Sequence, residues 1–192
     1  MPVTYENKII AQTALDVFGG IPQVIKYWDH MQRNSVDILS CADRPCEGVT
    51  SYSTIGLSEH SIGFTSDKLP LRVEIVGACA SEVQSYSNVL ANCALRIITL
   101  NNKCYPGAIF KNAIDISNIK REMEHILFVT PFVWDKSFTI INFPDKNVTW
   151  LNAVPISQTE LEYAEDEGIE ALEELFERHQ IDIFNLNRQS VK

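Results

Sequence analysis

Residues 147–177, with the sequence NVTWLNAVPISQTELEYAEDEGIEALEELFE, constrain the fold of this 192-residue chain more than any other stretch. The first part includes Val148, Trp150 and Val154, residue types that suit a half-buried strand. Pro155 follows and has no N–H to donate to a strand ladder. The pattern therefore predicts a strand over 148–154 that ends at Pro155.

A helix is predicted to start directly after this strand, at Ser157. Glu160 comes three residues later, which is the spacing of a capping box, in which serine and glutamate side chains each accept a hydrogen bond from the other residue's backbone N–H. Gly168 predicts a pause, and the helical pattern resumes through Phe176. The stretch thus predicts one strand followed by two consecutive helices.

Charge is concentrated in the same helical segment. The chain has 25 acidic and 16 basic residues and a net charge of −9. Residues 157–179 hold one base, Arg178, and nine acids: Glu160, Glu162, Glu165, Asp166, Glu167, Glu170, Glu173, Glu174 and Glu177. A pI near 4.9 argues against direct binding of nucleic acid, which needs clustered lysine and arginine. An acidic protein favours a basic partner instead.

Two explanations are open for this acidic segment. Glutamate is a good helix former, and negative charge near a helix N-terminus is favourable, so a solvated helix surface accounts for Glu160 and Glu162. The acids nearer the C-terminus are less well explained, because like charges at i,i+4 cost about 0.2–0.5 kcal/mol per pair. Asp166–Glu170, Glu170–Glu174 and Glu173–Glu177 have that spacing. The candidate partner-binding residues are Glu165, Asp166, Glu170, Glu173, Glu174 and Glu177.

The rest of the chain mixes strand and helix patterns without a linker or internal repeat. Besides 148–154, the predicted strands are 23–28, 35–41, 49–57, 69–76, 108–114, 124–131 and 138–143, and two further helices are predicted at 5–18 and 81–97. The strand 69–76 directs Val73 and Ile75 to one face and Arg72 and Glu74 to the other. We expect a single α/β (α+β) domain over 1–192, with a mixed, largely antiparallel sheet and packed helices.

No catalytic or metal-binding motif is recognisable. The five cysteines, Cys41, Cys46, Cys79, Cys93 and Cys104, have no paired C-x-x-C spacing, so buried reduced thiols are expected, with no cofactor. The four histidines, His30, His60, His125 and His179, are scattered, and His125 in an apolar strand suggests a satisfied core residue. No apolar run is long enough to span a membrane, and the first ten residues do not resemble a signal peptide, so we expect a cytoplasmic protein.

A spaced set of residues resembles a known family. The set comprises Ser53–Ser58 (STIGLS), Trp150–Leu151, Val154–Ile156, Glu160 with Gly168 downstream, and Arg188–Val191 (RQSV). Together these segments are similar to the suppressor-of-fused-like domain over residues 45–191.

The resemblance implies an α/β domain without enzymatic activity. Bacterial stand-alone members are immunity proteins that neutralise LXG-type polymorphic toxins carrying a C-terminal nuclease domain, so the implied partner is such a toxin. The matching positions are implied to be structural: Trp150 fills the core, Pro155 ends the strand, Glu160 lies in the capping box, Gly168 breaks the helix, and Arg188 ties the tail to the body through a carboxylate. The resemblance does not identify the residues that bind a toxin.

Two other functions remain open on the sequence. One is a non-catalytic scaffold that binds a regulatory peptide by β-strand addition, which needs an exposed strand edge. The other is a hydrolase using Glu59 with His60 or Glu124 with His125, which needs these side chains to converge in a pocket.

Overall fold

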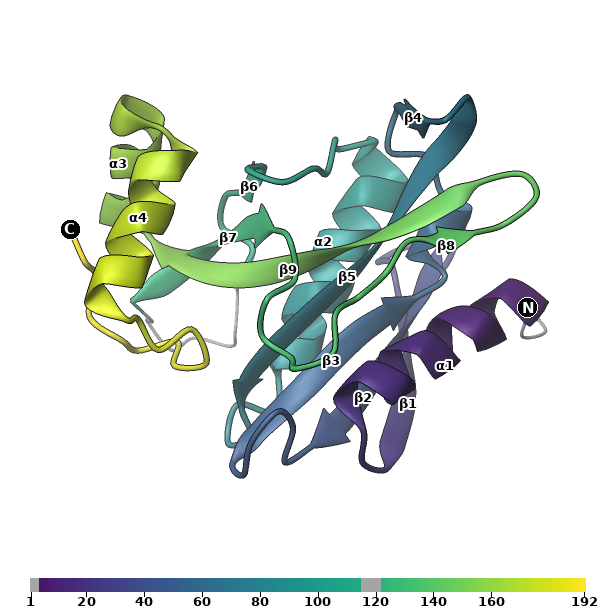
Figure 1. The fold of residues 1–192 in the computed structure, drawn as a ribbon, viewed down its shortest axis with the longest axis horizontal. Helices are drawn as coiled ribbons and strands as arrows, with labels where there is room; N and C mark the ends of the chain where they lie inside the picture. Colours follow the sequence, from purple (N-terminus) through teal and green to yellow (C-terminus); the bar gives the residue numbers. More distant parts are fainter. Residues whose placement is uncertain (1–3, 115–121) are drawn as a thin grey trace.

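A sheet of nine strands forms the centre of the computed structural model, which describes residues 4–114 and 122–192 (Figure 1). The strands are β1 (Pro22–Trp28), β2 (Ser35–Ala42), β3 (Val49–Ile55), β4 (Phe64–Ser66), β5 (Leu69–Ala80), β6 (Ile109–Phe110), β7 (Met123–Val129), β8 (Ile141–Asn142) and β9 (Asn147–Ser157). The helices are α1 (Tyr5–Phe18), α2 (Tyr86–Leu100), α3 (Gln158–Glu167) and α4 (Ile169–His179), with a 3-10 turn, η1 (Leu57–Glu59).

The strand order is β1-β2-β3-β5-β9-β7-β6, with β4 paired to β5 and β8 paired to β9. Neighbouring strands are antiparallel except β5 and β9, which run parallel with Leu71 opposite Asn147. The predicted mixed, largely antiparallel sheet with packed helices is therefore confirmed. In the described part of the chain, no helix is both long and apolar enough to cross a membrane.

Helices cover both faces of the sheet. α2 packs on one face, where Tyr86, Leu90 and Ile97 are fully buried. α1 covers the other face at one end of the sheet, and α3 and α4 cover that same face at the far end (Figure 1). β9 contacts the helices at both ends of this face: Trp150 packs with α1, and Val154 packs with α3 and α4.

Several predicted boundaries differ from the structure. β5 extends to Ala80, four residues beyond its predicted end, because it continues to pair with β3. α2 begins at Tyr86 rather than at 81, since residues 81–85 form turns. Only Ile141–Asn142 of the predicted strand 138–143 pairs in the sheet, and only Ile109–Phe110 of 108–114.

Pro155 does not end its strand, which corrects the sequence prediction. β9 continues to Ser157, and Pro155 lies opposite Ile126 of β7. The Pro155 carbonyl accepts a hydrogen bond from Arg188 Nη2 at 3.1 Å. Because the N–H and C=O of a strand residue point to the same side, the missing N–H faces Arg188 rather than the β7 ladder. The proline therefore costs no ladder hydrogen bond.

The segment 53–58 wraps around a buried carboxylate. Glu74 has no exposed surface, although the alternation in β5 predicts a polar face there. Its oxygens accept hydrogen bonds from Thr54 Oγ1 at 2.5 Å and from the Gly56 and Ser58 N–H groups at 3.0 Å each. Gly56 has φ +95° and forms the N-cap of η1, so the strand predicted over 49–57 ends at Ile55. Burial raises the pKa of Glu74 above its usual value, opposed by these hydrogen bonds.

Four of the five cysteines are buried as predicted, and the prediction is wrong for Cys46, which is exposed. Burial raises the pKa of the Cys93 thiol to about 12, so this side chain is an inert part of the α2 core. Among the residues that the structure describes, no group of three or more His, Cys, Asp or Glu side chains is arranged to hold a metal ion.

Candidate functional site

The acidic segment folds as two short helices joined at Gly168. The predicted capping box is present: Ser157 Oγ accepts from the Glu160 N–H at 3.1 Å, and Glu160 Oε2 accepts from the Ser157 N–H at 3.0 Å. Gly168 has φ +97° and ψ +161°, a conformation that is essentially restricted to glycine. α4 then packs Leu172 and Leu175 inward and leaves its glutamates outward.

A buried ion pair fixes these helices to the tail. Arg188 donates from Nη1 and Nη2 to the two oxygens of Glu160, at 2.6 and 2.7 Å. Glu160 is fully buried, and only 5% of the Arg188 side chain is exposed. The Val191 N–H also donates to Glu160 Oε1 at 3.1 Å, and the Arg188 guanidinium lies 5.3 Å from the Phe176 ring centre of α4. One pair therefore connects the end of β9, α3, α4 and the C-terminal tail.

Trp150 lies in the core on the same face of β9, beneath α1 rather than beneath α3 and α4. Its indole N–H donates to the Thr139 carbonyl at 3.1 Å, and its ring lies 4.7 Å from Phe138. Only 3% of its surface is exposed.

All six candidate acids are exposed on α3 and α4. Glu165 forms an ion pair with Lys111 at 2.5 Å, and because both side chains are about half exposed this pair contributes little stability. The predicted i,i+4 repulsion between Asp166 and Glu170 does not lie within one helix, because Gly168 separates them. Glu170–Glu174 and Glu173–Glu177 do lie within α4, as predicted.

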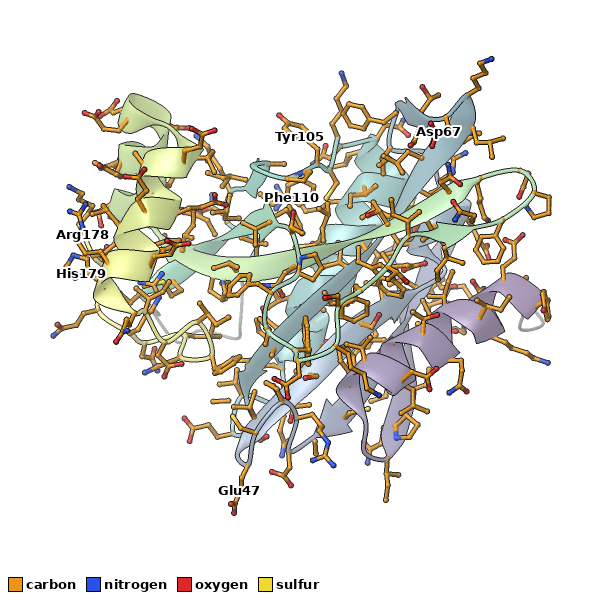
Figure 2. The ribbon with its side chains drawn as sticks, viewed as in Figure 1. Glu47, Asp67, Tyr105, Phe110, Arg178 and His179 are labelled. Atoms are coloured by element: carbon orange, nitrogen blue, oxygen red, sulfur yellow. The ribbon has the colours of Figure 1, made fainter. Side chains whose placement is uncertain are left out.

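In the described part of the chain, the basic residues of the last turn of α4, Arg178 and His179, form no ion pair with these carboxylates. Figure 2 shows Arg178 and His179 on the outer side of α4, pointing away from the sheet. Partial desolvation of the Glu173 carboxyl, followed by the charges of Glu170 and Glu177, raises its pKa above the usual value although the residue is exposed. The acidic surface therefore carries charge that the chain itself leaves largely uncompensated.

A groove lies between α4 and the end of the sheet, and the sequence did not predict it. It has a volume of about 530 Å³. Its walls come from the turn before β6, β7, the residues after β7, β9, α4 and the tail. The lining residues are Pro106, Leu127, Val129, Thr130, Phe132, Val154, Glu173, Phe176, Glu177, Gln180, Ile181 and Ile183. Only the two glutamates among these residues were candidates from the sequence. Apolar residues after β7 and in the tail carried no periodic pattern that would have placed them together.

The histidine–carboxylate pairs do not form an acid–base site. His125 is buried, with Nδ1 accepting from the Asn112 N–H at 2.9 Å and Nε2 2.9 Å from Gln158 Oε1. Because Nδ1 is an acceptor, Nε2 carries the proton and donates to Gln158, so this ring is satisfied. Burial lowers the pKa of His60, and its neighbour Glu59 accepts a hydrogen bond from Asn7 Nδ2 at 2.8 Å. None of the four residues in the two proposed pairs, Glu59 with His60 and Glu124 with His125, lines the groove.

Comparison with known proteins identifies the family. The sequence profile described as Suppressor of fused protein (SUFU) matches residues 32–189, so the chain belongs to the SUFU family. It is 52% identical over 191 residues to the immunity protein YqcF of Bacillus subtilis strain 168, covering the whole of both chains.

Solved structures show the same fold at low sequence identity. A SUFU homologue from Neisseria gonorrhoeae superposes with a TM-score of 0.68 at 15% identity, covering 97% of each chain. A Sufu–Fu complex gives a TM-score of 0.67 at 14% identity, covering 97% of this chain and 92% of the other. Drosophila Suppressor of Fused gives 0.55 at 14% identity, covering 88% of this chain but 42% of the fly protein.

Proposed function

We propose that this chain is an immunity protein that binds a cognate toxin and neutralises it. The observation that carries the proposal is the 52% identity to a Bacillus immunity protein along the full length of both chains. The proposed site of action is the cytoplasm of the cell that makes the toxin. The chain works by binding, and it transforms no substrate itself.

The proposed toxin is of the LXG type, with a C-terminal nuclease domain that cleaves DNA or RNA. A nuclease holds phosphates with lysine and arginine side chains, so its binding surface is basic. The exposed carboxylates of α3 and α4 complement such a surface and accelerate encounter with it. We assign part of the contact to Glu165, Asp166, Glu170, Glu173, Glu174 and Glu177.

Co-expression tests this function directly. The proposed LXG-type toxin is expressed in a sensitive host, alone and together with this chain. We expect survival only with both proteins, and co-purification of the chain with the C-terminal toxin domain. Killing that is unaffected by this chain, with no complex recovered, would refute the immunity function.

The edge strand β1 favours a second candidate function, a scaffold that adds a peptide strand to its sheet. β1 is the last strand at one side of the sheet, and Val24, Ile25 and Trp28 are each more than half exposed. An unpaired strand edge offers backbone groups to an extended peptide. If this candidate is right, replacing Ile25 with proline abolishes partner binding, whereas the immunity complex at α3 and α4 would tolerate that change.

A further inference from the structure

The groove beside α4 has an apolar floor. Leu127, Val129 and Val154 are at most 8% exposed, and Phe176 closes the helical side. Phe132 stands at the rim with 61% of its surface exposed. A volume of about 530 Å³ falls within the range of roughly 300–1,000 Å³ that is typical of ligand pockets. The groove therefore has room for more than one apolar side chain.

The charges at this groove are of one sign. Glu173 and Glu177 lie one helical turn apart on α4 and both line it. No lysine, arginine or histidine is found among the lining residues in the described part of the chain. An apolar floor next to two uncompensated carboxylates complements an apolar side chain that is followed by a basic one.

We propose that this groove receives a segment of the toxin in which apolar side chains enter between α4 and β7 while a neighbouring lysine or arginine pairs with Glu173 and Glu177. The inference rests on the proposed immunity function and specifies where the complex is anchored. The other carboxylates of α3 and α4 lie outside the groove and act at longer range, on encounter.

This division of roles predicts different kinetic effects for two matched double variants. Glu173→Gln with Glu177→Gln removes both groove charges, and Glu170→Gln with Glu174→Gln removes two charges from the same helix outside the groove. Buried contacts chiefly set the dissociation rate, and exposed charges chiefly set the association rate. We expect the groove pair to raise the dissociation rate by about tenfold or more, and the control pair to lower the association rate with dissociation nearly unchanged.

A second pair of variants tests the apolar part without changing charge. Thr130 is an exposed lining residue, so Thr130→Trp fills the groove. Thr65→Trp makes the same change at an exposed position of β4, far from α4 (Figure 1). We expect Thr130→Trp to weaken binding by about tenfold or more and Thr65→Trp to leave it unchanged.

The probe is the purified C-terminal domain of the toxin from the co-expression experiment, carrying a substitution that abolishes its nuclease activity. Its association and dissociation rates with the full-length chain and each variant are measured by surface plasmon resonance. Absence of binding by the wild-type chain would refute the immunity function itself. Tight wild-type binding with unchanged dissociation of both groove variants would overturn the groove proposal and leave that function standing. Equal effects of the groove and control pairs on dissociation would overturn it as well.

Discussion

Arg188 and Glu160 form a buried ion pair that connects the end of β9, α3 and the C-terminal tail. Both side chains are buried, and the carboxylate also completes the cap of α3. Removing one partner of a buried ion pair costs about 3–5 kcal/mol, because the other charge is left uncompensated in the interior.

Arg188→Met is therefore expected to lower the free energy of unfolding by about 3–5 kcal/mol in urea denaturation. Glu160→Gln keeps a capping-box side chain, since glutamine also serves at this position, but it leaves the guanidinium unpaired. The double variant is expected to be more stable than the sum of the two single changes predicts. Strict additivity would show that the two side chains do not act as a pair.

Glu74 makes stability depend on pH at a second buried position. Its pKa is raised in the folded state, so between the usual value of 4.5 and the raised value the folded chain binds more protons than the unfolded chain. Its contribution to stability is therefore largest at low pH and falls as the pH rises through this window.

Glu74→Gln removes this titration and retains a side chain that can accept from Gly56 and Ser58. We expect the stability advantage of wild type over this variant to shrink as the pH is raised from 4.5 to 8, in urea denaturation at each pH. A constant or growing advantage would contradict the raised pKa.

At the scale of single elements, Gly168 separates two helices that would otherwise merge. Nothing lies within 4 Å of the position that a Cβ would take, so a substitution there meets no steric obstacle. The cost of Gly168→Ala is therefore a backbone cost, about 1–3 kcal/mol for φ +97° with ψ +161°. Thermal unfolding measures it, and a variant as stable as wild type would show that the break between α3 and α4 tolerates a side chain.

The elements with strong local signals were predictable from the sequence. The helix predicted over 5–18 is present as α1. The Ser157–Glu160 spacing predicted the start of α3 correctly, because a capping box acts within one helical turn. The prediction that Pro155 ends its strand was wrong, because a proline disrupts a strand only on the side where its N–H would pair. β9 has no β5 partner at Pro155, and this depends on the arrangement of the whole sheet. The burial of Glu74 was also not predictable, because the alternation of apolar and polar residues in β5 cannot show that η1 covers the polar face of the strand.

The candidate site was predictable only in part. Charge counting found the six exposed acids, because charge density is local in sequence. It could not separate Glu173 and Glu177 from the others, since their distinction arises from residues 127–132 and 180–183, which fold against α4. Nor could it anticipate that Lys111 pairs with Glu165.

At the scale of the whole molecule, α3 and α4 lie at one end of the sheet (Figure 1). The proposed immunity function requires this end to meet a basic toxin. The charge of −9 lies mostly there, so association with such a partner is expected to be fast at low salt and to slow as salt screens the charges.

The most direct test is the association rate of the toxin domain at several salt concentrations, for wild type and for the variant Asp166→Lys, Glu170→Lys, Glu174→Lys. The three positions are exposed, so the fold should be retained, and circular dichroism checks it. We predict that the wild-type rate falls steeply with salt and that the variant associates at least about tenfold more slowly, with a weaker salt dependence. Equal rates and equal salt dependence would contradict the claim that these helices meet the toxin.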